Sequence, residues 1–263
     1  MKQTLGKVYL VGAGPGAPDL ITVRAARLLE RADIVFHDAL VHPDTVALAT
    51  MAEKIAVGKR CGRHSTAQRF INKRLIDAAH RFQTVVRLKG GDPMLFGRAQ
   101  EEIDALQAAG IEFEVVPGVT AALAACAELG ISLTRRGVSR NVTFATPRVG
   151  EGENPSDWIT SICSADSAAL YMAAGQAGAI AASLTASGMQ PDTPVVIVEN
   201  TSLPGMTQTA TTLGELQCAP EHIGRGPALV MIGRVFRRAG VGSRNHALQH
   251  DALQETFSAP LCA

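Results

Sequence analysis

Short apolar runs alternate with amphipathic segments along the first 130 residues. Each run is rich in Val, Ile or Leu, as is typical of strands buried in a sheet, and each amphipathic segment has the spacing of a helix. Strands are predicted at Lys7–Val11, Asp33–His37, Lys54–Val57, a run through Val85 and Val86, and Glu112–Val116. Helices are predicted at Thr22–Arg31, from Ser65 or Thr66 to His80, from Arg98 to Ala109, and at Ala121–Leu129. This alternation predicts an α/β fold with a parallel sheet between two helical layers.

The pattern changes after Gly130, where strands become more frequent than helices. Strands are predicted at Val142–Thr146, Ala169–Met172, Val195–Glu199, Gln208–Thr212 and Ala228–Val235, with one main helix at Ala177–Ser187. We therefore expect an N-terminal α/β domain over residues 1–134 and a second α/β domain over residues 135–236. Residues 237–263 show no periodicity, which predicts a flexible tail.

One helical segment supplies a clear example of a predicted core face. Phe70, Ile71, Leu75 and Ile76 are apolar at helical spacing. The spacing predicts a single stripe that packs into the core.

The composition narrows the functional classes. The formal net charge is +1 at pH 7, which argues against a nucleic-acid-binding protein. Five cysteines in no C-x-x-C pair, and histidines without H-x-x-x-H spacing, give no support for a disulfide framework or a metal site. The chain shows neither a signal-like leader nor an apolar run of membrane length, so we expect a cytoplasmic protein without a membrane partner.

The stretch Val85–Arg98, VVRLKGGDPMLFGR, has the pattern of a ligand site. A buried strand ends in Gly90, Gly91 and Asp92, and a helix begins near Arg98. Glycines allow a backbone to approach a bound molecule closely, and open α/β sheets bind ligands at the carboxyl ends of their strands. The sequence therefore predicts that the other loops at this edge converge on the turn.

Two neighbouring loops carry further candidates. Gly12, Gly14 and Ala17 satisfy the G-x-G-x-x-A spacing of dinucleotide-binding loops, but Pro15 and Pro18 stiffen the loop before its helix begins. We expect a pocket wall there, although an NAD-binding oxidoreductase remains an alternative. Asp38 follows a strand directly, which is consistent with a functional carboxylate or with a cap for the next turn.

These loops form a recognisable set in order and spacing: GAGPG, HDAL, VGKR, KGGDPMLFGR, VVPGVTA, LYMA, VVIVEN and GPALVMIGRV. In this set the chain resembles the uroporphyrinogen-III C-methyltransferases of the tetrapyrrole methylase superfamily. The resemblance implies two α/β domains with the active site in the cleft between them, working as a homodimer. It also implies two methyl transfers from S-adenosylmethionine to uroporphyrinogen III, giving precorrin-2 by way of precorrin-1, for sirohaem, cobalamin or haem d1. Larger relatives add a dehydrogenase-chelatase domain, and we expect the methyltransferase alone here.

The resemblance also implies roles for particular residues. Donor contacts are expected at Pro15, Gly90, Gly91, Asp92, Leu95, Thr120, Ala121, Met172, Thr201 and Ala228. Catalytic roles are expected for Asp38, Lys59, Arg98 and Glu101, and substrate contacts for Arg98, Arg136 and Arg63. Arginine suits a polycarboxylate substrate because its planar fork binds two carboxylate oxygens. Which side chain removes the macrocycle proton is left open, although the high pKa of a guanidinium favours an anchoring role for Arg98.

The chain departs from the family where the acceptor is expected. Arg135 and Gly137 stand where a His and an Asp are usual, and Thr146-Pro147-Arg148 replaces a T-G-H sequence. The alternatives left open are a methylase acting on a later precorrin or on diphthine, and a non-catalytic regulator that binds S-adenosylmethionine or a tetrapyrrole.

Overall fold

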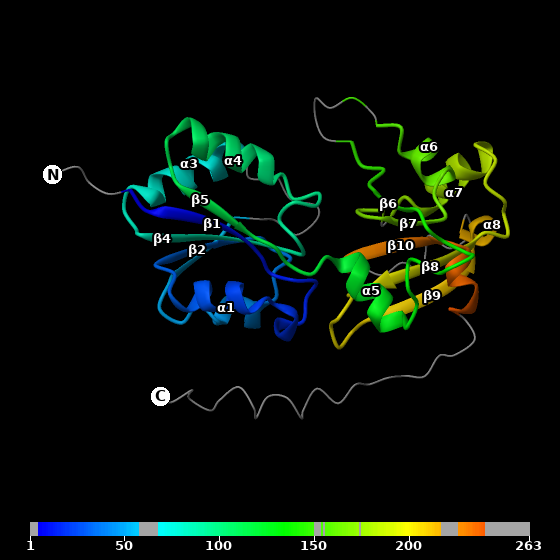
Figure 1. The fold of residues 1–263 in the computed structure, drawn as a ribbon, viewed down its shortest axis with the longest axis horizontal. Helices are drawn as coiled ribbons and strands as arrows, with labels where there is room; N and C mark the ends of the chain where they lie inside the picture. The colour runs from blue at the N-terminus through cyan, green and yellow to red at the C-terminus, as the bar shows by residue number, and fades with distance from the viewer. Residues whose placement is uncertain are drawn as a thin grey trace.

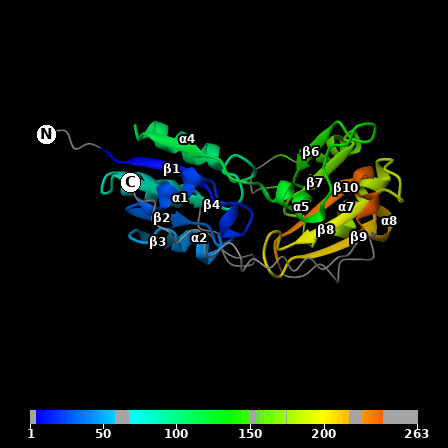
Figure 2. The same cartoon turned by 60° about the horizontal axis from the view of Figure 1, so that its bottom comes forward.

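The computed structural model describes residues 5–57, 68–149, 154, 156–173, 175–216 and 226–239. These residues form two lobes, and each lobe is built on one five-stranded sheet (Figures 1 and 2). The predicted α/β fold with two sheets is confirmed.

The first sheet is entirely parallel and has the strand order β3-β2-β4-β1-β5. Its strands are β1 (Lys7–Gly12), β2 (Ile34–His37), β3 (Glu53–Ala56), β4 (Thr84–Lys89) and β5 (Phe113–Val116). Because all five run in one direction, the loops that follow them leave the same edge of the sheet.

Helices cover both faces of this sheet, as Figure 1 shows for α3 and α4 on one face and α1 on the other. Their bounds are α1 (Val23–Glu30), α2 (Pro43–Ala47), α3 (Gln68–Ala79) and α4 (Ala99–Ala108). Thr22 caps α1, since its hydroxyl accepts the N–H of Ala25. Two apolar cores result: α3 and α4 bury Leu75 and Leu106 on one face, and α1 buries Leu29 on the other. The predicted three-layer arrangement is confirmed.

The second sheet is mixed, with the strand order β6-β7-β10-β8-β9. Its strands are β6 (Val142–Ala145), β7 (Ser167–Leu170), β8 (Pro194–Glu199), β9 (Thr207–Thr212) and β10 (Ala228–Gly233). Only the β6–β7 pair is parallel, and the other three pairs are antiparallel. This matches the change of pattern after Gly130, where strands follow one another with few helices between them.

Both faces of the second sheet are covered as well. One face packs against α6 (Trp158–Cys163), α7 (Ala177–Ala186) and α8 (Leu213–Leu216), and the other against α5 (Ala121–Leu129) and a 3-10 helix (Arg234–Arg238). The helix α5 has its predicted bounds, but its buried Ala122 and Ala125 pack with Val196 and Met231 of the second sheet. This packing favours a domain boundary before α5, whereas the boundary at residue 134 remains a prediction.

Two details differ from the sequence pattern. Phe70 lies on the exposed side of α3, where its ring stacks against Arg74, so the predicted stripe is reduced to Ile71, Leu75 and Ile76. The short helices α2, α6 and α8 were not predicted, because each is too short to show a helical period. In the described part of the chain, no helix has the length and apolar character needed to cross a membrane.

Candidate active site

The loops of the first sheet meet because the ends of its central strands are in register. Gly12 at the end of β1 lies beside Lys89 at the end of β4, and Val11 lies beside Val116 of β5. His37 of β2 lies beside Leu88 of β4. The GAGPG loop, the HDAL segment, the KGGDP turn and the VVPGVT loop therefore leave the sheet at one edge, as the sequence predicts.

Glycines allow the backbones of these loops to pack directly on one another. Gly14 and Gly91 exchange two backbone hydrogen bonds, of 2.7 and 3.2 Å. A Cβ on Gly12 would lie 2.6 Å from the Cα of Gly118 and 2.7 Å from the carbonyl oxygen of Gly91. Gly12 and Gly14 are therefore buried against other loops, and the pocket wall expected from the first loop stays a prediction.

Gly90 is the exception in this group. It is exposed, and the nearest neighbour of a Cβ placed there would be the Cβ of Leu40 at an ordinary contact distance of 3.8 Å. The next glycine, Gly91, has a left-handed φ of +67°, which favours glycine. The turn thus has one glycine fixed by its backbone conformation and one glycine with open space beside it.

Asp92 holds the turn in place. Its Oδ1 accepts the N–H of Met94 at 2.8 Å, and its Oδ2 accepts the N–H of Gly118 at 3.0 Å. The first bond closes a local turn, and the second ties the KGGDP turn to the loop after β5. The capping role that the residue type allows is thus seen directly, and a contact of Asp92 with the donor stays a prediction.

Tyr171 connects the second sheet to the start of α5. Its hydroxyl accepts the N–H of Ala122 at 3.1 Å and lies 2.6 Å from Oγ1 of Thr120. Its ring packs against that of Phe96, from the first-lobe turn, with the ring centroids 5.1 Å apart. Burial raises the pKa of the Tyr171 phenol. Met172 follows at once with a left-handed φ of +55° and a partly exposed side chain.

A second connection between the lobes joins the GAGPG loop to the turn after β8. The N–H of Ala17 donates to Oγ of Ser202 at 3.0 Å. A Cβ on Gly16 would lie 3.1 Å from the carbonyl oxygen of Thr201, so these backbones pack closely. Ala228 lies beside Glu199, the last residue of β8. The structure therefore brings the donor residues predicted in the second lobe to the edge that carries those of the first.

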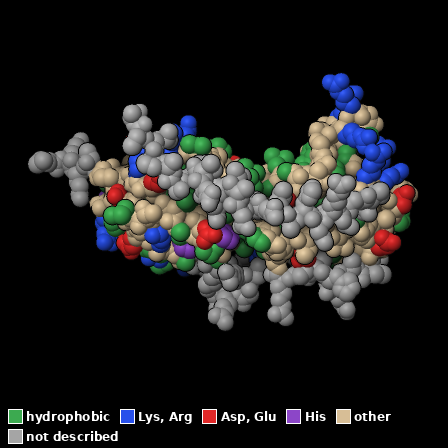
Figure 3. Space-filling view, turned by 90° about the horizontal axis from the view of Figure 1, so that it is seen from below, with side chains coloured by type: hydrophobic (Ala, Val, Ile, Leu, Met, Phe, Trp, Pro, Cys, Tyr) green, Lys and Arg blue, Asp and Glu red, His purple; other side chains and the backbone are tan. Residues whose placement is uncertain are grey.

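The junction between the lobes can be followed on the molecular surface (Figure 3). In the space-filling view the surface is indented between the lobes, and hydrophobic side chains border the indentation (Figure 3). Met94, Phe96 and Met172 are among the exposed hydrophobic residues. Apolar side chains beside glycine turns are what a ligand with both polar and apolar parts requires.

Asp38 belongs to a largely buried ionic network. Its Oδ1 lies 2.5 Å from Nη2 of Arg87 in β4, and the same arginine donates through Nε to Oε1 of Glu102 at 3.0 Å. Lys89 donates to Oε2 of Glu102 at 2.9 Å. The side chains of Arg87, Lys89 and Glu102 are 3%, 3% and 0% exposed, whereas that of Asp38 is 29% exposed.

The pKa values of the two buried cations are shifted in opposite directions, that of Lys89 downward and that of Arg87 upward. Burial lowers the pKa of Lys89, and the positive charge of Arg87 lowers it further, against the attraction of Glu102. Burial also opposes the charge of Arg87, but Asp38 and Glu102 outweigh it and raise the pKa of the guanidinium. Arg87 is therefore a permanent cation between two carboxylates.

Arg98 and Glu101 form a separate, exposed pair at the start of α4. The guanidinium donates to both oxygens of Glu101, at 2.6 and 2.8 Å. The two side chains are 59% and 51% exposed, so the pair contributes little stability and can exchange partners readily. Arg98 also has a left-handed φ of +54°, as has Phe96 at +52°, and strained residues of this kind cluster at functional sites.

The remaining predicted site residues are Lys59, Arg63 and Arg136. Lys59 and Arg63 lie outside the described residues. Arg136 is exposed in a turn that closes on Ser139, whose hydroxyl lies 3.0 Å from that of Ser167 at the start of β7. Tyr171 follows the other end of β7, so no described contact brings Arg136 to the turn, and its substrate role stays a prediction.

Sequence reasoning did not single out Arg87, Lys89, Glu102 or Tyr171 as site residues. A signal was present for two of them, since Arg87 and Lys89 alternate within an apolar strand and a buried charge requires a partner. Nothing in the sequence identifies Glu102 as that partner, because adjacent Glu101 is exposed and differs only in its position around α4.

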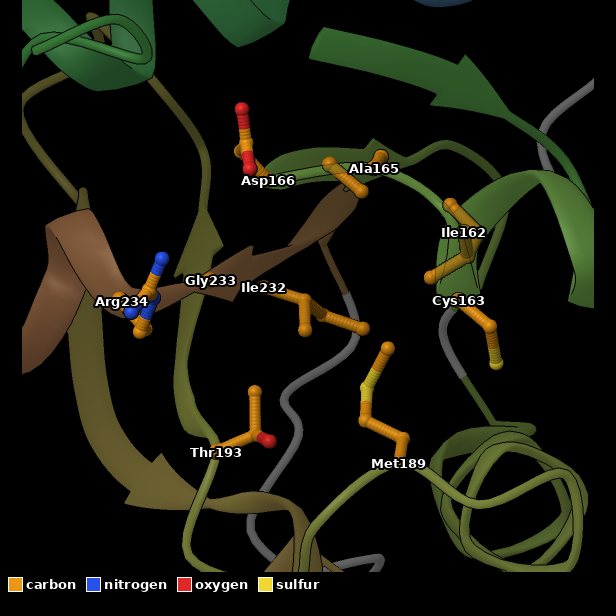
Figure 4. Close-up of a pocket in the computed structure, with 10 residues that line it drawn as sticks. Ile162, Cys163, Ala165, Asp166, Met189, Thr193, Ile232, Gly233 and Arg234 are labelled. Carbon is orange, nitrogen blue, oxygen red and sulfur yellow. The ribbon is translucent and has the colours of Figure 1, made fainter. Parts of the chain in front are cut away.

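The second lobe also contains a hollow of about 220 Å³ away from these loops (Figure 4). It lies near Asp166 and Gly233, at the end of the sheet opposite to Tyr171. The sequence-predicted site residues do not line it, and the hollow is not part of the candidate site. Among the described residues, no three side chains of the metal-binding types come together.

Residues 7–217 match the family of Tetrapyrrole (Corrin/Porphyrin) Methylases. The chain belongs to this family. The two sheets, the glycine-packed loops and the junction between the lobes are therefore the frame of a tetrapyrrole methylase, and the resemblance read from the sequence motifs is confirmed.

Individual relatives agree with this assignment. The chain is 42% identical to the uroporphyrinogen-III C-methyltransferase of Pseudomonas aeruginosa over 88% of its own length and 95% of that protein. It is 43% identical to the siroheme synthase of Zymomonas mobilis over 88% of its own length, but it spans only 49% of that longer protein. A solved structure of the uroporphyrin-III C-methyltransferase of Thermus thermophilus, complexed with S-adenyl homocysteine, superposes with a TM-score of 0.78 at 38% identity. That match covers 88% of this chain and 99% of the solved one.

Proposed function

We propose that this tetrapyrrole methylase transfers two methyl groups from S-adenosylmethionine to carbons of uroporphyrinogen III. The product is precorrin-2, formed by way of precorrin-1. The observation that carries the proposal is the 42% identity to the Pseudomonas aeruginosa enzyme named for this activity, over nearly the whole of that protein. The Thermus thermophilus neighbour, complexed with the demethylated form of the donor, supports the choice of methyl donor.

The donor is expected at the junction of the lobes, against the KGGDP turn. Gly90 and Gly91 let its polar parts approach the backbone, and Leu95 and Met172 supply apolar contacts. Methyl transfer between a sulfonium and a carbon needs the two reacting centres held in line, so positioning supplies much of the acceleration. A turn tied at Asp92 to two other backbone groups provides that rigidity.

The acceptor is a polycarboxylate, and its side of the site is expected to be basic. The exposed position of Arg98 at the end of the turn, and its bidentate contact with the Glu101 carboxylate, support this role. A substrate carboxylate would replace Glu101 in the same geometry. Arg136 and Arg63 are proposed as further contacts, and Lys59, Asp38 and Glu101 as groups that serve the proton loss accompanying carbon methylation.

The assembly and setting are also proposals. We expect a homodimer in the cytoplasm that supplies precorrin-2 for sirohaem or cobalamin. The match to siroheme synthase over half of that protein's length supports the sirohaem route. Sedimentation of the purified protein tests the dimer.

The assignment is tested with purified protein, uroporphyrinogen III and S-adenosylmethionine carrying a labelled methyl group. We expect two labelled methyl groups on each macrocycle, with a monomethylated intermediate at early times. Omission of the donor and a heat-denatured sample serve as controls. Donor binding by calorimetry without any methyl transfer to uroporphyrinogen III would contradict the proposal.

A second candidate is a methylase of the same family with another reduced tetrapyrrole as its acceptor. Arg135 and Gly137 replace the usual residues of a loop expected to contact the acceptor, and the adjacent Arg136 makes no described contact with the turn. The same assay with later precorrins distinguishes the two candidates. Preference for a methylated precorrin over uroporphyrinogen III would favour the second.

A further inference from the structure

Charged side chains occupy a position in β4 that the fold would otherwise fill with apolar ones. Val85, Arg87 and Lys89 alternate along this central strand, and their side chains share the face that packs against α3 and α4. Val85 lies in the apolar core of that face. Toward the carboxyl end of the strand, the core gives way to Arg87 and Lys89, both almost fully buried.

Glu102 of α4 compensates both cations. Each of its oxygens accepts from one of them, and Oε1 also accepts from the amide of Gln68 at 3.1 Å. Buried ion pairs often give no more stability than apolar residues of similar size would. The network is therefore poorly explained by stability alone, and its position beneath the catalytic edge suggests a function.

The network reaches the site through Arg87. Its Nη2 contacts Oδ1 of Asp38, and its Nη1 donates to the carbonyl oxygens of Leu88 and Phe36 at 3.2 and 3.5 Å. Because Nε donates to Oε1 of Glu102, every nitrogen of the Arg87 guanidinium has a hydrogen-bond partner. The main-chain N–H of Asp38 also donates to the carbonyl oxygen of Leu88 at 3.1 Å. Asp38 is thus held by both its backbone and one oxygen of its side chain.

The other oxygen of Asp38 has no hydrogen-bond partner among the described residues, and it belongs to the partly exposed member of the network. We propose that Arg87, oriented by Glu102, is a positioning residue that fixes the Asp38 carboxylate so that Oδ2 faces the acceptor macrocycle. This role rests on the proposed tetrapyrrole methylation. It gives a function to Arg87 and Glu102, which lie buried beneath the candidate site. Arg87 itself does not touch the substrate in this arrangement.

The test is a double-mutant cycle with Arg87→Met and Asp38→Asn, read as kcat and as KM for each substrate. If Arg87 acts through Asp38, each single change lowers kcat on the order of a hundredfold, and the double variant is no slower than the slower single one. KM for S-adenosylmethionine stays unchanged. Arg87→Lys restores part of kcat, because it keeps a cation beside Asp38, and Glu102→Gln lowers kcat by releasing the guanidinium.

A control variant in the same helix separates a loss of stability from a loss of catalysis. Leu106→Ala opens a space in the core between α4 and the sheet without removing a charge, and its kcat per folded molecule is expected to equal that of the wild type. Folded fractions of all variants are measured by thermal unfolding at the assay temperature.

Two results would overturn the role of Arg87: an unchanged kcat in Arg87→Met, or losses that multiply fully in the double variant. Failure of the proposed function looks different, since the wild type itself would then leave uroporphyrinogen III unmethylated. The acceptor that it methylates among other reduced tetrapyrroles would then serve for the cycle, and the same two results would decide the role of Arg87. A wild type that methylates none of these acceptors would overturn both proposals.

Discussion

The hydroxyl of Tyr171 lies 2.6 Å from Oγ1 of Thr120 and accepts the N–H of Ala122 at 3.1 Å. Tyr171 follows β7 of the second sheet, and Thr120 ends the loop that leaves β5 of the first. One phenol thus fixes the start of α5, where the chain passes between the lobes. Thr120, which is expected to contact the donor, is held by this bond, and Met172, with the same expected role, is the next residue after Tyr171.

Tyr171→Phe should lower stability without changing the fold. Removing the hydroxyl leaves Thr120 and the Ala122 N–H without this partner, at a cost of about 1–2 kcal/mol. A fall of a few degrees in the melting temperature, on the order of 2–4 °C for each kcal/mol, is expected by calorimetry. Tyr9→Phe is the matched control, because no described residue forms a hydrogen bond with the Tyr9 hydroxyl. Equal losses in both variants would contradict the role given to Tyr171.

Gly90→Ala should weaken donor binding while the protein stays folded. The added methyl group meets only Leu40, at 3.8 Å, so the free enzyme accommodates it. A donor that packs against this glycine would be displaced, and a roughly tenfold rise in its dissociation constant is expected by calorimetry. Gly205→Ala is the control, since a Cβ there meets nothing within 4 Å. Unchanged donor affinity in Gly90→Ala would remove this glycine from the donor site.

Arg98→Met should raise KM for the tetrapyrrole and leave donor affinity unchanged. Loss of a bidentate contact to a substrate carboxylate costs about 1.5–3 kcal/mol, or roughly tenfold or more in KM. Stability should change by less than about 0.5 kcal/mol, because the pair with Glu101 is exposed. Lys73→Met, which breaks a similarly exposed pair with Asp77, should alter neither KM nor stability. A rise in KM for both substrates together would indicate a general distortion of the site.

The Cys126 thiol should resist alkylation at mildly alkaline pH. Burial raises its pKa to about 11, against a weaker opposing effect of the hydrogen bond involving the Leu133 backbone. At pH 8 only on the order of one thiol in a thousand is then ionised, and the thiolate is the reactive form. Labelling by iodoacetamide, followed by peptide mapping, should rise about tenfold for each pH unit between 8 and about 11.

The raised pKa of Cys126 also makes the stability of the folded protein depend on pH. Between the ordinary value of 9.0 and about 11, the unfolded thiol has lost its proton while the folded one retains it. The folded state therefore loses stability as pH rises through this window. Urea-unfolded protein should label rapidly at pH 8, and equally rapid labelling of folded protein would show that Cys126 is less buried than described.

Much of the fold follows from local pattern. The predicted α5 and the strands β2 to β5 agree with the structure to within about two residues where their bounds were predicted, because strand and helix periods differ clearly in these segments. The convergence of loops on Gly90 and Gly91 also follows, since parallel strands place their carboxyl ends at one edge. The tightly packed role of Gly12 did not follow, because the sequence shows that a residue is small without showing what approaches it.

The sequence by itself determined the class of the fold, the motifs of the family and the turn proposed as the centre of the candidate site. These depend on interactions between near neighbours in the chain, or on a spacing that the motifs preserve. Only the tertiary structure decided that Arg87, Glu102 and Asp38 form one network, and that Tyr171 fixes Thr120. Those pairs come from elements packed across a sheet or between the lobes, and whether a charge or hydroxyl finds its partner there depends on the three-dimensional packing.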